Sequence, residues 1–227
     1  LIEKFSISAK LAQECGFDGV EIHAAHGYLL SSSLSPRINN RKDKWGGSFE
    51  NRARLLQLIL QKVRESVGNN FILAVKINSS DFQKGGLEIS DSVKIANLIE
   101  KENIDFIEVS GGNFEAPEAY QYVSLKESTK SREAYFLDAA KNIKASVSIP
   151  IMVTGGFRSI SVMEDALTSS STDLIGIGRP FVIDPSFPYK LLNGDISVLP
   201  AVERNFPPAQ DIPKGAVLNW FCDQLAL

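Results

Sequence analysis

The chain has 227 residues, 44% of them hydrophobic and 22% charged, and a net charge of −3 with both signs interspersed. This composition is ordinary for a water-soluble globular domain, and it argues against a nucleic-acid-binding or polybasic membrane surface. No apolar run approaches the ~20 residues of a membrane span and no secretory leader opens the chain, so we expect a cytoplasmic protein. The two cysteines, Cys15 and Cys222, lie far apart without metal-ligand spacing. This argues against a disulfide scaffold, a zinc finger and an iron–sulfur cluster.

Helices and short apolar strands alternate along the chain. Helical spacing of apolar residues predicts a first helix that ends before Gly16, and the run from Gly19 predicts a strand ending near His23. Further strands are predicted at residues 71–77, 105–109, 150–153 and 173–177. Helices are predicted at residues 48–67, 90–101, 132–145 and 162–169, around 189–192, and near 216–225. The connections at residues 27–47 and 113–131 are longer than usual, which indicates functional loops.

The alternation predicts βαβ units and a parallel sheet, and the continuous apolar strands indicate a sheet covered on both faces. Five β-units are present, whereas a closed (β/α)₈ TIM barrel has eight strands and typically ~250 residues. We therefore interpret residues 1–194 as an incomplete α/β barrel that holds about strands four to eight, with the first three βα units missing. Residues 195–227 are expected to form a C-terminal tail.

Two glycine-rich turns follow the last two predicted strands. Gly155 and Gly156 follow the strand at 150–153, and Gly178 and Arg179 follow the strand at 173–177. In TIM barrels the loops after strands seven and eight commonly hold a phosphate, because backbone N–H groups can approach the oxygens and an arginine adds charge. The alternative is that these glycines only turn the chain, and two such loops beside an arginine favour the phosphate site.

Polar side chains also gather where the first two strands end. His23 and His26 can be a metal pair without an evident third ligand, core histidines, or hydrogen-bond donors to an oxyanion. Tyr28 either takes part in the chemistry or packs on its loop. Lys76 ends an otherwise apolar strand, where it either reaches solvent or requires a partner.

The stretch from Asp18 to Arg52 resembles the signature of the old yellow enzyme family, the flavin-dependent NAD(P)H oxidoreductases. The matching residues are His23-Ala24-Ala25-His26-Gly27-Tyr28-Leu29, Ser35-Pro36, Asn39, Arg41, Asp43 and Gly46-Gly47-Ser48-Phe49-Glu50-Asn51-Arg52. Trp45 stands where many members have Tyr, which is similar to the NADH:flavin oxidoreductase / NADH oxidase branch. The resemblance extends to about Gly194.

This resemblance implies a TIM barrel that binds FMN, with the glycine turns and Arg179 on its phosphate. Lys76 would lie beside the N1–C2 edge of the flavin and stabilise the anionic reduced form. His23 and His26 would hold the carbonyl oxygen of an α,β-unsaturated substrate, and Tyr28 would give a proton to the α carbon.

Other residues receive structural assignments. We expect Glu21 to point away from the neighbours of His23 and to be structural. Ser110-Gly111-Gly112 follows the third predicted strand and is expected to line the flavin cavity. Four residues that match the family loop are expected to form a network that holds this loop, and they are Arg41, Asp43, Asn51 and Arg52.

The favoured hypothesis is an FMN-dependent enzyme that passes hydride from NADH or NADPH through the flavin to an activated alkene or similar small-molecule acceptor. It has no nucleic-acid or membrane partner, and a homo-oligomer of the full-length protein is one option for its assembly. The alternative is a truncated product with an incomplete flavin site and no activity of its own. A third hypothesis is a different barrel enzyme that uses the phosphate loops without flavin. Related dienoyl-CoA reductases carry an iron–sulfur cluster, for which this chain shows no cysteine-rich segment.

Overall fold

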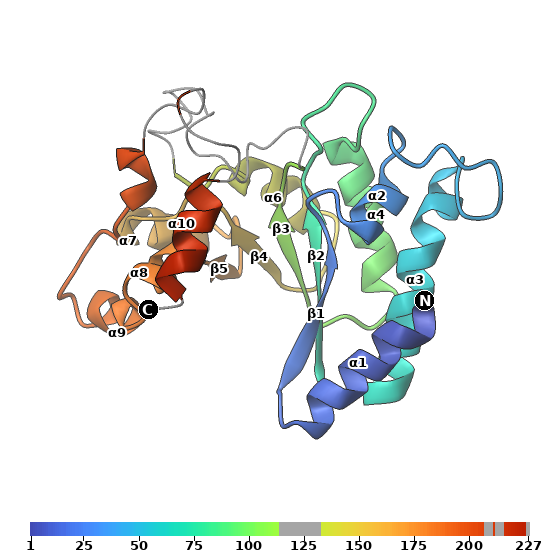
Figure 1. Ribbon diagram of the computed structural model, residues 1–227, viewed down its shortest axis with the longest axis horizontal. Helices are drawn as coiled ribbons and strands as arrows, with labels where there is room; N and C mark the ends of the chain where they lie inside the picture. The colour runs from blue at the N-terminus through green and yellow to red at the C-terminus, as the bar shows by residue number, and fades with distance from the viewer. Residues whose placement is uncertain (114–132, 207–210, 212–215, 226–227) are drawn as a thin grey trace.

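The computed structural model describes residues 1–113, 133–206, 211 and 216–225 of the chain. Five parallel strands form one sheet in the order β1-β2-β3-β4-β5, so that each strand pairs with the next one in the sequence (Figure 1). The strands are β1 (Gly19–Ala24), β2 (Ile72–Asn78), β3 (Phe106–Ser110), β4 (Ile151–Thr154) and β5 (Leu174–Gly176). This is the parallel α/β arrangement expected from the alternating sequence pattern.

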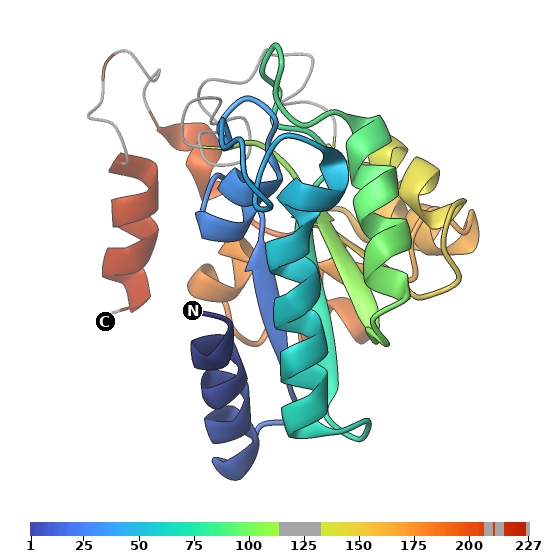
Figure 2. The same cartoon turned by 90° about the vertical axis from the view of Figure 1, so that its right-hand side faces the viewer.

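Helices connect the strands, and Figure 2 shows α1, α3 and α4 as a layer on one side of the sheet. The described helices are α1 (Ile2–Glu14), α2 (Leu29–Leu34), α3 (Phe49–Val67), α4 (Ile89–Glu100), α6 (Leu137–Lys144), α7 (Ile160–Thr168), α8 (Arg179–Ile183), α9 (Phe187–Leu192) and α10 (Ala216–Leu225), with a 3₁₀ turn at Val202–Asn205. Among the residues described, no helix is long and apolar enough to span a membrane.

Ser48 and Gly68 begin and end the longest helix. The Ser48 side chain accepts a hydrogen bond from the backbone N–H of Asn51 at 3.3 Å, which satisfies one of the free donors of the first turn of α3. Gly68 ends the helix with φ +74°, a conformation that favours glycine. Leu56, Ile59, Leu60 and Val63 lie on the buried side of α3.

The two faces of the sheet differ in composition. The face toward the helices is aliphatic, and its paired row Ile22, Val75 and Ile107 is buried. On the opposite face, strand pairing places His23, Lys76 and Glu108 side by side. This face also exposes apolar residues near its ends, among them Ile72 and Leu174. The expectation of apolar strands on both faces is therefore wrong for the described strands, because imidazole, ammonium and carboxyl groups occupy the second face.

Three predicted boundaries require correction. The loop at 27–47 contains the short helix α2, and the helix predicted at 132–145 begins only at Leu137. The helix predicted from residue 90 begins at Ile89, because Glu88 is its N-cap and Asp91 accepts from the backbone N–H of Glu88 at 3.4 Å. Except for Asn113, the predicted loop at 113–131 lies outside the described residues.

Candidate active site

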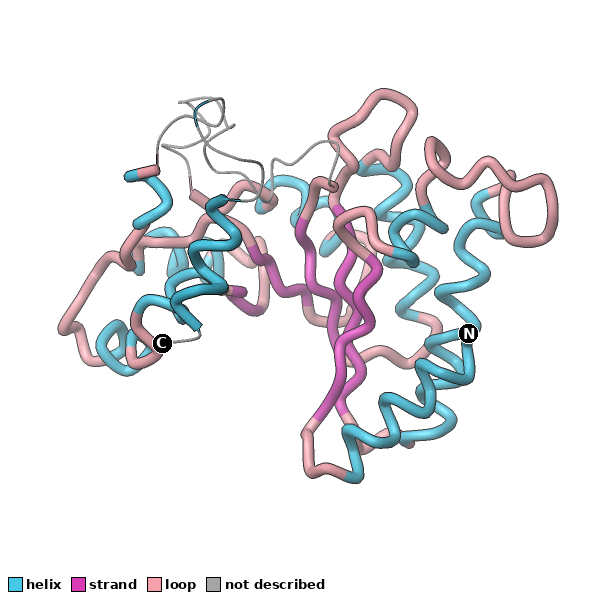
Figure 3. The backbone as a smooth tube through the Cα atoms, in the orientation of Figure 1, coloured by secondary structure: helices cyan, strands magenta, loops and turns pink. Residues whose placement is uncertain are grey.

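The loops that follow the parallel strands gather at the carboxyl edge of the sheet (Figure 3). At the end of β1, the ring centroids of His23 and His26 are 5.1 Å apart with an interplanar angle of 78°. The ring of Tyr28 lies 5.1 Å from that of His23. The structure therefore brings together the three side chains that the sequence singled out.

Buried polar groups hold His26 in place. Its backbone N–H donates to Asn78 Oδ1 at 3.0 Å, and its Nε2 lies 2.9 Å from Ser110 Oγ. The Asn78 amide donates to Asp81 Oδ1 at 3.0 Å, and Ser35 Oγ donates to Asp81 Oδ2 at 2.8 Å. His26 has φ +65°, which is uncommon for a residue with a side chain and requires such support. The sequence reasoning missed Asn78 and Asp81, although both follow the apolar run of β2.

Both imidazoles are neutral at pH 7. Burial, helped by the nearby charge of Lys76, lowers the pKa of His26 to about 3. Burial and the same charge also lower the pKa of His23. Each neutral ring keeps one N–H donor for a ligand or neighbour. Among the described residues no group of three or more His, Cys, Asp or Glu side chains could hold a metal ion, so the metal-pair interpretation gains no support.

Lys76 is paired and does not extend to solvent. Its Nζ lies 2.6 Å from Glu108 Oε1, and the side chains of Lys76 and Glu108 are only 19% and 6% exposed. Glu108 also shares a hydrogen bond with Glu21. The expectation that Glu21 points away is wrong, because residues two apart on a strand share a face and Glu21 lies on the face of His23.

The two carboxyl groups have displaced pKa values. Although residue Glu21 is exposed, its carboxyl group lies against Glu108, and desolvation together with that hydrogen bond raises the pKa of Glu21 to about 8. Burial acts to raise the pKa of Glu108, but the hydrogen bond from Glu21 and the charge of Lys76 outweigh it and leave this pKa below its ordinary value. Displaced carboxyl pKa values of this kind are frequent at functional sites.

A cavity of about 180 Å³ lies at the carboxyl ends of the strands. His26, Lys76 and Ser110 line it from the β1–β3 side. From the β4–β5 side it is lined by the predicted phosphate residues Gly155, Gly156, Gly178 and Arg179. The structure thus joins residues that lie up to 153 positions apart in the sequence into one site.

The two glycine turns differ in how closely the protein packs against them. Gly155 and Gly156 have positive φ, and added Cβ atoms would lie 2.7 Å from the Phe136 ring and 2.6 Å from the Tyr135 ring. A Cβ added at Gly178 would meet no atom within 4 Å, so protein packing alone does not require glycine there. With Arg179 beside them, these turns offer backbone N–H groups and a guanidinium, which are the groups that bind a phosphate. Tyr135 and Phe136 also line the cavity, which was missed because both were assigned to a helix.

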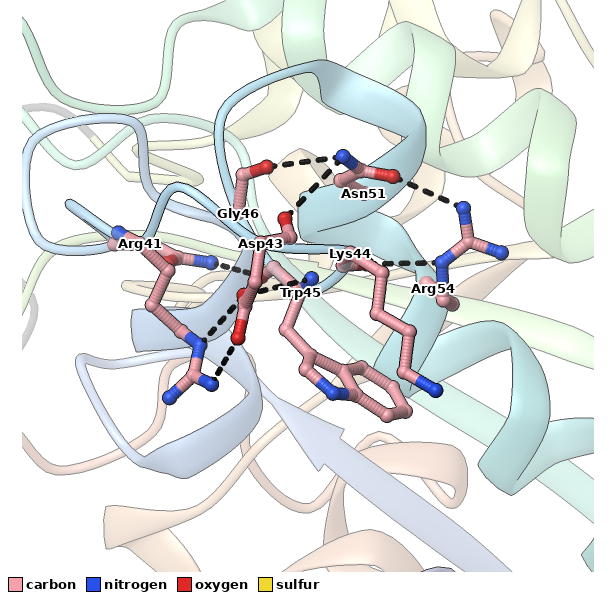
Figure 4. A network of polar contacts seen from close by, with 8 residues as sticks. Arg41, Asp43, Lys44, Trp45, Gly46, Asn51 and Arg54 are labelled. Atoms are coloured by element: carbon pink, nitrogen blue, oxygen red, sulfur yellow. Dashed lines mark hydrogen bonds and ion pairs between the residues drawn. The ribbon is translucent and has the colours of Figure 1, made fainter.

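The polar residues of the loop before α3 form the expected network (Figure 4). Arg41 and Asp43 form an ion pair, and Asp43 Oδ1 accepts from the backbone N–H of Trp45 at 3.1 Å. Asn51 donates to the carbonyl of Gly46 at 3.1 Å, and a further hydrogen bond joins Arg52 Nη1 to the carbonyl of Gly47 at 2.7 Å. These contacts fix the loop backbone, which supports a structural role for the four residues.

A parallel sheet with helices on one face and a polar cavity at the carboxyl ends of its strands is the arrangement of barrel-type α/β enzymes. The sequence profile of the NADH:flavin oxidoreductase / NADH oxidase family matches residues 1–195. The chain belongs to this family of oxidoreductases, whose flavin is FMN.

Individual proteins agree with this assignment. The NADH-dependent flavin oxidoreductase iliE of Neonectria sp. is 40% identical over 197 residues, which are 83% of this chain and 25% of that protein. The structure of a 2-naphthoyl-CoA reductase complexed with 2-naphthoyl-CoA matches with TM-score 0.80 and 33% identity, covering 87% of this chain and 30% of that one. An old yellow enzyme homologue from Zymomonas mobilis has the same fold, with TM-score 0.69, 23% identity, and coverage of 94% and 56%. The chain spans about half or less of the length of iliE and other curated relatives.

Proposed function

We propose that this chain is the part of an FMN-dependent NAD(P)H oxidoreductase that contains strands four to eight of a (β/α)₈ barrel. Residues 1–194 would form the barrel part, and residues 195–227 the C-terminal tail. The observation that carries the proposal is the single cavity lined by His26, Lys76 and both glycine turns. Family membership and the sequential, parallel strand order support it.

The β4–β5 side of the cavity would hold the phosphate of FMN. Backbone N–H groups at Gly155, Gly156 and Gly178 can approach its oxygens, and the Arg179 guanidinium adds charge-assisted hydrogen bonds. Lys76 would face the pyrimidine edge of the ring system, where a cation favours added negative charge. Ser110 lies between these groups on the cavity wall.

The β1 end would hold the acceptor. Bound FMN supplies hydride transfer from NADH or NADPH to an electron-poor acceptor such as an α,β-unsaturated carbonyl compound. The neutral rings of His23 and His26 would donate hydrogen bonds to the carbonyl oxygen and stabilise negative charge as it develops there. The Tyr28 hydroxyl, on the ring next to His23, would deliver a proton to the substrate carbon.

The size of the cavity supports the view that other parts of the protein complete the site. Cofactor sites typically enclose about 300–1,000 Å³, more than the roughly 180 Å³ observed here. Among the described residues β1 is an edge strand of the sheet, and additional strands would pair with its outer edge and enclose the polar face. In a complete enzyme such strands would join this chain, so the open edge of the sheet does not require the alternative of a truncated, inactive product.

The test is to purify the product of the complete gene and the chain of residues 1–227 separately. We expect the complete product to be yellow, to retain FMN after gel filtration and to oxidise NADH or NADPH in the presence of an enone. His23→Ala and His26→Ala should abolish enone reduction while FMN remains bound, and Arg179→Ala should weaken FMN binding. Glu14→Gln, at the exposed end of α1, is the control.

Three other outcomes decide against parts of the proposal. A complete product that stays colourless after FMN is added would favour a barrel enzyme without flavin. Full flavin binding and activity in residues 1–227 alone would contradict the incomplete site. If neither protein reduces an enone although both bind FMN, the assigned acceptor class is wrong.

A further inference from the structure

Three ionisable side chains from neighbouring strands form a cluster on the polar face. Lys76 Nζ is 2.6 Å from Glu108 Oε1, and Glu108 is in turn hydrogen-bonded to Glu21. Of the three, only Lys76 lines the cavity. The two carboxyl groups therefore lie behind the cation that faces the ligand, and the proposed catalysis assigns them no role.

A hydrogen bond between two carboxyl groups requires a proton. An ionised carboxylate is only an acceptor, so Glu21 and Glu108 can be bonded to each other only when one of them is protonated. The ammonium of Lys76 stabilises the ionised form of Glu108. The proton consequently resides mainly on Glu21, and the Glu21 carboxyl donates to Glu108.

We propose that Glu21 and Glu108 form a proton-sharing pair that sets the charge Lys76 presents to the cavity and takes up or releases one proton as the charge of the bound group changes. With the proton in place, the side chains of Lys76, Glu108 and Glu21 are neutral in sum. Without it they carry one negative charge, which repels an anionic or electron-rich ligand. The identity of that ligand, FMN, rests on the proposed function, whereas the carboxyl pair does not.

The environment of Glu21 and Glu108 places their titration at a pH at which it can be measured. Desolvation and the contact with Glu108 raise the pKa of Glu21 to about 8. The two imidazoles on this side of the sheet are already neutral above pH 7, because burial lowers the pKa of both His23 and His26. The neighbouring positions Met152 and Leu174 of β4 and β5 are uncharged, and the other cationic side chains that line the cavity are those of Arg158 and Arg179. Around pH 8 the change in charge of the described part of this face therefore comes from the carboxyl pair.

The first experiment observes the pair directly, without flavin. The protein from the complete gene is prepared without FMN, with ¹³C in the glutamate carboxyl groups, and its NMR spectrum is recorded between pH 4 and 10. We expect one carboxyl signal to titrate near pH 8 and to disappear in Glu21→Gln. Glutamine keeps a donor to Glu108, so this variant mimics the protonated pair at every pH. Glu14→Gln, in which an exposed carboxyl group is removed, should leave the signal unchanged.

The second experiment measures the midpoint potential of bound FMN against pH by reductive titration with dithionite. Two-electron reduction adds negative charge near Lys76, which raises the pKa of the pair, so the pair takes one proton from water onto a carboxylate oxygen. Above pH 8 we expect the wild-type protein to take up as much as one more proton per two electrons than Glu21→Gln. Below pH 7 the two proteins should show the same slope.

The results separate this proposal from the proposed function. A wild-type spectrum in which no glutamate titrates above pH 7 overturns the proton-sharing pair, even if Glu21→Gln does not fold. Equal slopes of potential against pH in both proteins above pH 8 overturn its coupling to the cavity. A protein that binds no FMN but shows the titration near pH 8 contradicts the proposed function and leaves the carboxyl pair established.

Discussion

The helix-covered face of the sheet is made of aliphatic side chains, whereas the other face carries imidazole, ammonium and carboxyl groups. The two sets alternate along the same strands: Ile107 and Glu108 are adjacent in β3, and Ile22 and His23 are adjacent in β1. One face supplies the packing that stabilises the fold, and the other face supplies groups held in fixed relative positions. We therefore expect different effects from substitutions one residue apart. A substitution on the aliphatic face should lower the stability of the fold, whereas one on the polar face should impair the reaction with the ligand.

The largest effect is expected from the aliphatic face. Ile107→Ala removes a side chain that is 0% exposed between β3 and the helices, and such truncations cost about 2–5 kcal/mol. His23→Ala, on the exposed face of β1, should leave the free energy of unfolding nearly unchanged while enone reduction is lost. Urea unfolding of the two variants, with activity measured on the folded fraction, tests the contrast. Equal destabilisation by both would show that the polar face also carries much of the fold stability.

Substitution of Asp81, which holds Asn78 beside His26, should both lower the stability of the fold and change the surroundings of His26. Asp81 is 1% exposed and accepts hydrogen bonds from Ser35, from Asn78 and from the backbone N–H of Leu87 at 2.9 Å. Asp81→Ala leaves these donors unsatisfied, which costs about 1–3 kcal/mol for each group that stays buried without a partner. We also expect a changed chemical shift of the His26 ring, since Asn78 no longer has a fixed orientation.

The matched control for this prediction is Asn97→Ala, which removes an amide that donates within α4, at 2.8 Å to the carbonyl of Val93. It should change the stability less and leave the His26 signal in place. If Asp81→Ala leaves the His26 signal unmoved, Asp81 acts on the stability of the fold alone.

The sequence predicts the packed, aliphatic face of the sheet better than the contacts on its polar face. The pattern of apolar residues located the five strands and the helix predicted at residues 48–67, because burial of one side of an element leaves a repeating pattern. The resemblance also named six residues that line the cavity, namely His26, Lys76, Gly155, Gly156, Gly178 and Arg179, whereas His23 and Tyr28, which it named too, are not among the lining residues. It gave no sign of the contact between Glu21 and Glu108, since pairing across strands depends on register, which a single sequence does not show. The cavity positions of Tyr135 and Phe136 were missed because helical propensity continues through a segment that the structure leaves non-helical.

The smallest predicted effect concerns the pH dependence of stability. His26 has a pKa of about 3 in the native protein and an ordinary value near 6.5 in the unfolded chain. The unfolded state therefore binds more protons between these values, and the native state loses stability as the pH falls from about 6.5 toward 3, by at most ~1.4 kcal/mol per pH unit for one such group. Above pH 7 this contribution is fully present.

His26→Asn removes the titrating group, so its urea midpoint should fall less steeply than that of the wild-type protein between pH 6.5 and 5. A second titrating imidazole, His23, stays in both proteins and cancels in the comparison. Identical pH dependence in the two proteins would mean that folding does not lower the pKa of His26, and the burial of a neutral His26 ring on the polar face would then be wrong.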